Sequence, residues 1–270
     1  MGEVPLIKFS VDIDWRDWIE RWDKMQNGYL PSRVERFELM IETIASTQRS
    51  VTRVLDIGCG TGSLMLPVLK RFHEAEVFGI DFDPTLLALA ERRLSEYSDR
   101  VHLVQADLRD DSWLKRVPSP NDAAVSATAL HWFNPEQLER FYKQLARVLR
   151  SGGIFLNADH VRNDCESVQE GRQRHRDQIL DRMLFGHQIL EQGRDTRAED
   201  WEGFWEAYGR ALKIDINSLR WNVTGPWEGS EEGLTLDWHF EKLKASGFGA
   251  VDCFWRCDCD AVYGGIRQPA

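Results

Sequence analysis

The stretch VLDIGCGTGSL, residues 54–64, decides how this chain is expected to fold. It begins as an apolar run that contains one acid, Asp56, and it then passes into three closely spaced glycines, Gly58, Gly60 and Gly62. A short apolar run that ends at turn residues is typical of a buried strand. Glycines directly after a strand let the backbone approach a ligand with no side chain in between. The stretch therefore predicts a strand that ends at a bound ligand.

Residues 51–160 alternate between strand-like and helical patterns. The expected strands are VTRVLDIG (51–58), VFGID (77–81), VHLVQAD (101–107), DAAVSATA (122–129) and GGIFLNADH (152–160). Asp83 and Pro84 form a helix start, because aspartate caps the first turn and proline fits inside it. Short apolar strands separated by helices predict an α/β fold with a parallel sheet covered on both faces.

The flanking segments predict the domain organisation. Residues 1–50 read as an N-terminal helical lid, with Trp15, Trp18 and Trp22 at helical spacing, and with Ser32 and Glu35 in a capping-box pattern before a second helix. Residues 161–235 read as a mainly helical insertion that caps the molecule. A helix and two closing strands return in 236–270, which together with 51–160 form the ligand-binding core.

The composition is that of a packed, acidic chain of 270 residues with 11 tryptophans and a formal net charge of -10. This balance disfavours binding to a nucleic-acid backbone, which requires a basic face. No apolar run is long enough to cross a bilayer, and residues 1–14 lack the basic start and apolar stretch of a signal peptide. We therefore expect a cytoplasmic protein with no nucleic-acid and no membrane partner.

The five cysteines favour free thiols, since their number is odd and the chain is expected to be cytoplasmic. Cys253, Cys257 and Cys259 lie close together, but they lack the paired spacing of a zinc site, and an alternating strand would turn them to different faces. We expect no metal.

Three acids stand at the ends of three successive expected strands: Asp56, Asp81 and Asp107. A dinucleotide-binding turn would place its third glycine at residue 63, which is Ser63. An acid beside the glycines would also repel a phosphate. The three carboxylates suit instead an ammonium group, a ribose diol and the amine of adenine. These are the groups that S-adenosylmethionine carries.

Four motifs in chain order resemble those of the class I S-adenosylmethionine-dependent methyltransferases: VLDIGCGTGSL, GIDFDP (79–84), QADLRD (105–110) and LRSGGIF (149–155). The resemblance implies a Rossmann-like, doubly wound sheet of seven strands with the last one antiparallel, S-adenosylmethionine as cofactor, and S-adenosylhomocysteine as product. It also implies cofactor contacts. Gly58, Gly60 and Gly62 would pass the methionine part, Asp81 would hold the ribose, Phe82 would lie against the adenine, Asp107 and the backbone of Leu108 would face its amine, and Ala127 would line the methionine end.

The methyl acceptor is expected beside the fourth and fifth strands. His131, in the segment TALHWF, is the candidate for a base or for a donor that orients the acceptor, although a role in packing the next helix explains it equally well. Trp132 would supply an apolar wall. His160 beside Asp159 is a second polar pair, for which capping of the next segment is the favoured role.

Further substrate contacts are expected from the N-terminal segment and the insertion. Tyr29 and Arg33 are candidates for the cofactor's carboxylate, although a solvated position explains Arg33 better. A more distant likeness to trans-aconitate methyltransferases implies an acidic acceptor, which would need basic partners. The insertion offers Arg162, Arg172, Arg174 and Arg176 for this purpose, and a solvated helix face explains them as well.

The leading hypothesis is thus a methyltransferase acting on an oxygen, nitrogen or carbon of a small molecule. At the fourth strand, SATA replaces the Asn-Pro-Pro-aromatic motif that methylation of a base amine would favour. Two alternatives stay open. One is a NAD-dependent oxidoreductase on a related sheet, and the other is a non-catalytic module that binds S-adenosylmethionine.

Overall fold

The computed structural model describes residues 8–30, 32–180, 199–217, 219 and 228–269. Its centre is one sheet with the strand order β3-β2-β1-β4-β5-β8-β7. The strands are β1 (Arg53–Ile57), β2 (Glu76–Asp81), β3 (Val101–Gln105), β4 (Asn121–Ala127), β5 (Leu149–Arg162), β7 (Phe248–Cys257) and β8 (Asp260–Arg267). All neighbours are parallel except β8, which runs antiparallel to both β5 and β7. This confirms the expected doubly wound sheet with an antiparallel last strand.

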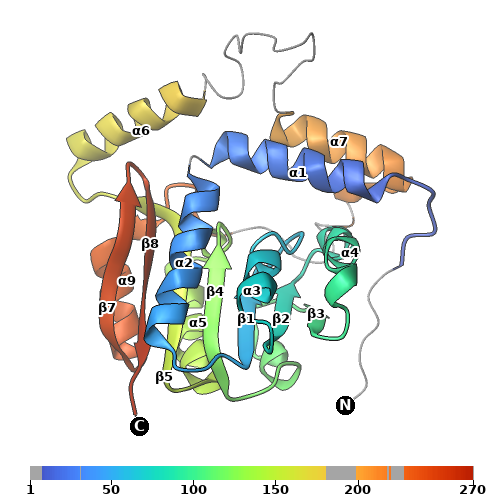
Figure 1. Cartoon of the computed structure of the whole chain (residues 1–270). Coiled ribbons are helices and arrows are strands. Elements are labelled where there is room, and N and C mark those ends of the chain that lie inside the picture. The colour runs from blue at the N-terminus through green and yellow to red at the C-terminus, as the bar shows by residue number, and fades with distance from the viewer. Residues whose placement is uncertain (1–7, 31, 181–198, 218, 220–227, 270) are drawn as a thin grey trace.

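Helices cover both faces of the sheet (Figure 1). One face carries α2 (Arg33–Thr47), α3 (Met65–Arg71) and α4 (Pro84–Arg93), and the other carries α5 (Pro135–Val148) and α9 (Leu236–Ala245). Successive residues of β1 serve the two layers in turn, since Val54 packs with α2 and α3 whereas Leu55 packs with α5. Burial on both faces explains why the strands read as continuous apolar runs.

Two short features of the chain were not expected. A two-residue strand, β6 (Leu234–Thr235), pairs in parallel with the end of β5. Three short 3-10 helices connect larger elements: η1 (Ser95–Tyr97), η2 (Ser112–Lys115) and η3 (Leu130–Trp132). Of these, η3 lies directly after β4 and bears on the candidate site.

The sequence predicted N-terminal caps for two helices, at Asp83 and at Ser32. Asp83 caps α4 as expected, with its carboxylate accepting from the amides of Thr85 and Leu86. The capping box at Ser32 was wrong, because Ser32 takes a left-handed φ of 61° and makes no side-chain cap hydrogen bond. An N-cap serine needs extended backbone to reach the first-turn amides. The tight connection from α1 to α2 does not leave Ser32 in that conformation.

Two helices lie over the carboxyl ends of the parallel strands: α1 (Trp15–Tyr29) and α7 (Trp201–Leu212), which run side by side in Figure 1. Their aromatic rings interlock, with Trp18 5.8 Å from Phe204 and Trp22 5.8 Å from Trp205. Of the two helices in the expected lid 1–50, α1 takes this position, whereas α2 packs on the sheet. We call α1 and α7 the cap.

The expected insertion is only partly described, since 181–198, 218 and 220–227 fall outside the described residues. Its described part contains α6 (Glu166–Leu180) and α7. None of the described helices is long and apolar enough to span a membrane. All five cysteines belong to the described residues and are free thiols.

Candidate active site

A cavity of about 760 Å³ lies between the carboxyl ends of the parallel strands and the cap. In open α/β sheets this is where ligands bind. Most of the expected site residues line this cavity, but Gly62, Asp159 and three of the four arginines considered for an acidic acceptor do not. The cavity therefore brings together residues from positions 29 to 160, which the chain carries on separate elements.

The glycine turn after β1 is bonded to the end of β2. The amides of Gly58 and Cys59 both donate to the carbonyl of Ile80, at 2.8 and 3.0 Å. Gly60 has a left-handed φ of 52°, and a Cβ there would meet no protein atom closer than 3.9 Å, so its glycine leaves open space on the cavity. The turn thus presents bare backbone to a ligand.

Gly62 has a different role from the one expected. It does not line the cavity. Its φ is 73°, and a Cβ there would lie 2.8 Å from the Leu94 side chain behind the turn. Backbone conformation and packing toward α4 account for the glycine at position 62.

Asp81 ties the turn to β2. One carboxylate oxygen accepts from the amide of Gly60 at 2.8 Å, and the other accepts from the amide of Asp83 at 2.9 Å. The side chain is 6% exposed and faces the cavity. A carboxylate has about four acceptor positions, so one group can bond the turn and also face a ligand in the cavity.

Asp56 is a buried acid on the wall of the cavity. It is 2% exposed, and among the described residues no donor reaches its Oδ2. Burial, together with the nearby carboxylate of Asp81, raises the pKa of Asp56 to about 8. A buried acid without a partner on the wall of a cavity suits a cationic ligand group, and the ammonium of S-adenosylmethionine fits it.

The adenine side of the cavity contains Phe82, Leu108 and Asp107. Asp107 is not an isolated acceptor, because Arg109 bonds both of its carboxylate oxygens: Nε donates to Oδ1 at 3.0 Å, and Nη2 donates to Oδ2 at 2.6 Å. Such pairs fix both groups in place. The pair leaves the Asp107 carboxylate on the cavity wall with less capacity for an adenine amine than the sequence suggested. Ala127, at the end of β4, lines the same cavity.

His131 forms a buried pair with Asp159. Its Nδ1 lies 2.7 Å from Asp159 Oδ1, and the side chain lies on η3 facing the cavity. Asp159, on β5, also accepts from the backbone amides of Leu130, His131 and His160. Burial disfavours the charged imidazole, but the charge and hydrogen bond of Asp159 outweigh it and raise the pKa of His131. Although burial acts the other way, His131 holds the pKa of Asp159 well below its usual range.

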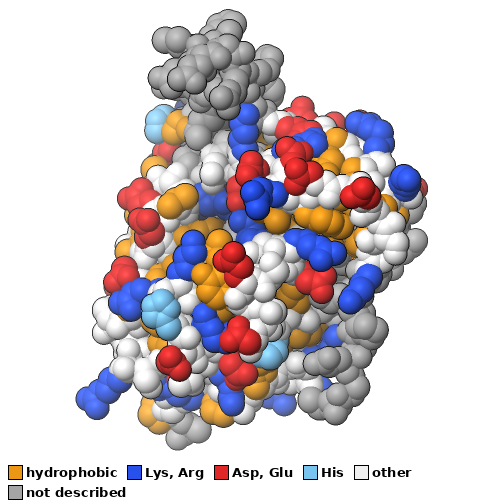
Figure 2. Space-filling model, turned by 45° about the vertical axis from the view of Figure 1, so that its right-hand side comes forward, with side chains coloured by type: hydrophobic (Ala, Val, Ile, Leu, Met, Phe, Trp, Pro, Cys, Tyr) orange, Lys and Arg blue, Asp and Glu red, His pale blue; other side chains and the backbone are white. Residues whose placement is uncertain are grey.

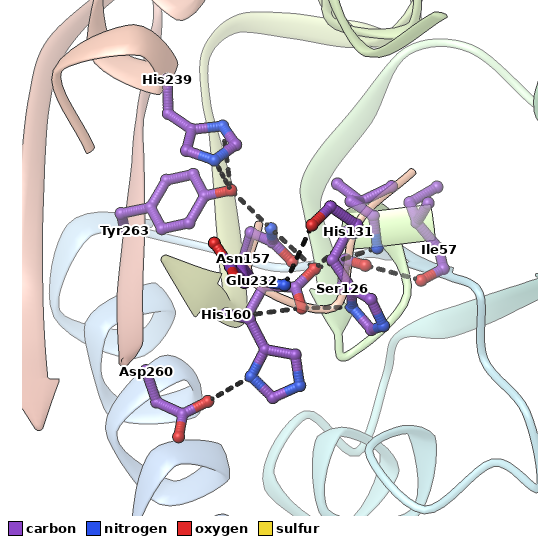
Figure 3. Close-up of polar contacts among 12 residues, drawn as sticks. Ile57, Ser126, His131, Asn157, His160, Glu232, His239, Asp260 and Tyr263 are labelled. Carbon is purple, nitrogen blue, oxygen red and sulfur yellow. Dashed lines mark hydrogen bonds and ion pairs between the residues drawn. The ribbon is translucent and has the colours of Figure 1, made fainter. Parts of the chain in front are cut away.

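His160 forms a second pair of the same kind. Its Nδ1 lies 2.8 Å from Asp260 Oδ1, and Asp260 in turn lies 3.5 Å from Arg36. All three side chains are buried. The two imidazole rings are 4.9 Å apart and lie next to each other in Figure 3. The expected capping role of His160 therefore gives way to a buried ion-paired position on the cavity wall.

The remaining expected contacts lie on the cap side of the cavity. Arg33 is paired with Asp23 at 3.5 Å, and burial lowers its pKa to about 10 although Asp23 opposes the shift. Tyr29 accepts from the amide of Trp201, which joins α1 to α7. Trp132 packs at 4.7 Å from the His131 ring. The Arg33 side chain is 10% exposed, so it lies on the cavity wall and not in open solvent.

Of the four arginines considered for an acidic acceptor, only Arg176 lines this cavity. Its Nη2 lies 3.4 Å from His160 Nε2, and its buried Nε has no partner among the described residues. Arg174 is exposed and pairs with Glu170. Arg162 lines a second cavity of about 220 Å³ behind His131.

A buried polar chain continues from His131 into that second cavity (Figure 3). Asn157 donates to the Tyr263 hydroxyl at 2.8 Å, and that hydroxyl lies 3.1 Å from His239. Burial lowers the pKa of His239 to about 3, although the charge of Asp159 opposes this, so His239 stays neutral near pH 7. These side-chain hydrogen bonds join β5 to β8 behind the site.

Sequence reasoning missed two residues of the cavity region. Asp260, the partner of His160, stands 100 positions away from it in the chain, and no spacing signal connects them. Glu231 lines the cavity from the segment before β6, where the sequence shows only a run of charges. Only the folded sheet brings these groups together.

Comparison with known proteins identifies the core. Residues 54–153 match the family described as methyltransferase domain. A malonyl-[acyl-carrier protein] O-methyltransferase of Halorhodospira halophila is 26% identical over 77% of this chain and 70% of its own length. A tRNA N(3)-cytidine methyltransferase of Danio rerio is 30% identical over 43% of this chain and 34% of its own.

The structural comparison extends over almost the whole chain. An S-adenosylmethionine-dependent methyltransferase from Clostridium acetobutylicum superposes with a TM-score of 0.59, at 12% identity, over 94% of this chain and 99% of the other. At that identity the match establishes the fold. Among curated relatives, three are matched over only 33%, 58% and 34% of their own lengths.

Proposed function

Because the chain belongs to the class I S-adenosylmethionine-dependent methyltransferases, we propose that it transfers the methyl group of S-adenosylmethionine to a small-molecule acceptor. One observation carries the proposal. A single cavity is lined by Asp56, Gly60 and Asp81 on one side and by His131, whose ring Asp159 holds from behind, on the other. A cofactor at the first and an acceptor at the second would meet inside it.

The residues of the first side suit S-adenosylmethionine part by part. Asp56 would receive the ammonium group, Asp81 would bond the ribose hydroxyls, and Phe82 would lie against the adenine. The cofactor supplies an activated methyl group on a sulfonium, so the protein has to hold the acceptor in line with that methyl and exclude water. The cap of α1 and α7 covers the cavity, so it would exclude the water.

On the other side, His131 is proposed to orient the acceptor or to take its proton. The methyl group passes from sulfur to the acceptor atom, the sulfur keeps the bonding electron pair, and the acceptor's proton goes to the imidazole. Asp159 fixes the ring through Nδ1 and stabilises its charged form. A base whose pKa lies near the working pH is favourable for this task.

A small acceptor is favoured over a nucleic acid by three features. The cavity volume lies in the range of small-molecule sites. The net charge is -10, and Figure 2 shows acidic and basic side chains interspersed over the face that it presents. The relative that acts on tRNA is matched over only 34% of its length. The basic groups on the wall, Arg33 and Arg176, favour an acceptor that carries an acid.

The test is methyl transfer from labelled S-adenosylmethionine, with small carboxylic acids, phenols, amines and unmodified tRNA as acceptors. We expect label in a small molecule, and strongly reduced transfer in His131→Ala. His102→Ala is the matched control, because His102 lies half exposed on β3, away from the cavity, and bonds Glu76. Labelled tRNA would overturn the acceptor class. Transfer at the full rate in His131→Ala would overturn the role of His131.

A further inference from the structure

We propose that His131, His160 and Glu231 form a binding site for one divalent transition-metal cation of the zinc type. One ligand atom from each residue can be chosen such that all three lie within 4.8 Å of one another. The site is distinct from the cofactor half of the cavity. The inference goes beyond the proposed function: a cation at this site would replace the role of His131 as a base, and the transfer of methyl from S-adenosylmethionine would stay as proposed.

The three residues come from separate elements that the fold brings together. His131 lies on η3, His160 lies on β5, and Glu231 lies in the connection before β6. All three line the large cavity, so a cation held by them would keep positions open toward it. Three protein ligands and an open position are the pattern of catalytic zinc sites, including sites built from two histidines and a glutamate.

The second observation is how the two histidines are held. His131 Nδ1 lies 2.7 Å from Asp159, and His160 Nδ1 lies 2.8 Å from Asp260. Both carboxylates are almost fully buried, at 1% and 5% exposure. A metal-binding histidine commonly uses its other ring nitrogen in this way, since a carboxylate partner fixes the tautomer and makes the free nitrogen a better ligand. Each Nε2 is then the ring nitrogen left to bind a cation, and that of His160 now lies 3.4 Å from Arg176.

The local charge allows a cation. The carboxylates of Asp159, Asp260 and Glu231 oppose the two guanidinium groups of Arg36 and Arg176. Arg36 is itself paired with Asp260. Arg176 lies 3.4 Å from His160 Nε2, so this guanidinium must move away when the cation binds. Among the described residues Arg176 makes that one long hydrogen bond and its Nε has no partner, so little holds the guanidinium there.

The chemical consequence concerns the acceptor. Imidazole nitrogen and carboxylate oxygen together suit zinc, cobalt and nickel. With the cation in place His131 acts as a ligand, and the open position faces the acceptor half of the cavity. An oxygen group bound there loses its proton more readily than it does in water. The site would therefore select an acceptor that binds through oxygen.

The test titrates the metal-free full chain with Co²⁺ alone, followed by visible absorption and by equilibrium dialysis. We expect one Co²⁺ per chain and an absorption band without the charge-transfer feature of a thiolate. Glu231→Gln should weaken binding at least about tenfold, the lower end of what the loss of a metal-supporting group costs. Glu232→Gln, the neighbouring exposed acid, is the matched control and should leave binding unchanged. His160→Gln should abolish it.

Three results would overturn the proposal: no saturable binding, equal binding in wild type, Glu231→Gln and His160→Gln, or binding that blocking the thiols removes. S-adenosylmethionine binding, measured on the same samples, separates this inference from the proposed function. A protein that binds the cofactor and not Co²⁺ retains its proposed function and loses the metal site.

Discussion

Asp56→Asn should make the ligand-free protein more stable, and it should do so more strongly as pH rises. Burial, with Asp81 nearby, raises the pKa of Asp56 from 3.8 to about 8. The folded protein therefore binds a proton at Asp56 that the unfolded chain has released, at every pH between these two values. Where the folded state binds more protons, stability falls with rising pH.

The magnitude follows from the size of the shift. Each pKa unit corresponds to about 1.36 kcal/mol. Below pH 3.8 the group contributes nothing, and its cost then grows until the pH passes about 8. Between pH 5 and pH 8 this amounts to about 3 to 4 kcal/mol, and asparagine, which does not ionise, avoids it. The gain of the variant over wild type should grow by this amount across the interval.

The assay is urea denaturation of wild type and Asp56→Asn at pH 5 and pH 8, together with calorimetry of S-adenosylmethionine binding at one pH. The variant should bind the cofactor at least about tenfold more weakly, because the ammonium group loses an opposite charge. If the variant is more stable and binds S-adenosylmethionine more weakly, Asp56 destabilises the free protein and contributes to cofactor binding. A stability difference that is the same at both pH values would refute the reasoning.

Three further substitutions separate the parts of the structure. Asp81→Ala should weaken S-adenosylmethionine binding by about a hundredfold with an unchanged circular dichroism spectrum, and unchanged binding would remove Asp81 from the site. Gly62→Ala should lower the free energy of unfolding by about 1 to 3 kcal/mol and leave cofactor affinity within about twofold. Gly60→Ala should mainly weaken cofactor binding. The reverse pattern in denaturation and calorimetry would contradict the packing role of Gly62 and the ligand-facing role of Gly60. Trp18→Ala should cost about 3 kcal/mol in urea denaturation, since the ring is buried against Phe204, and a cost below about 1 kcal/mol would show that the cap contributes little.

The sheet was predictable because its signals are local. Each strand of a doubly covered sheet is buried on both faces, and β1 and β4 are accordingly buried along almost their whole length and contain consecutive aliphatic residues. The start of α4 was equally readable, since Asp83 and Pro84 act within one turn. The capping prediction failed at Ser32 because a cap pattern gives a side-chain hydrogen bond only when the N-cap residue itself has an extended backbone.

The cofactor half of the cavity was largely predictable, since its residues follow strand ends in a fixed order. Gly62 is the exception, because a side chain there would collide with Leu94, and the sequence does not reveal that contact. Asp107 shows a further limit. Its partner Arg109 is only two positions away, but an arginine at that distance is usually solvated, and only the structure shows the bidentate pair.

The acceptor half was the least predictable part. His131 was singled out, but its partner Asp159 lies 28 positions away, on the neighbouring strand. The approach of His160 and Glu231 depends on how the connection before β6 returns to the end of β5. Contacts of this kind are set by tertiary packing, so no periodicity or spacing in the chain encodes them.

The central claim is that the cavity at the strand ends binds S-adenosylmethionine. Calorimetric titration of the purified chain with S-adenosylmethionine, and with NAD in a parallel experiment, tests it most directly. The account predicts saturable binding of one S-adenosylmethionine per chain and no binding of NAD. Binding of NAD in place of S-adenosylmethionine, or of neither, would contradict it.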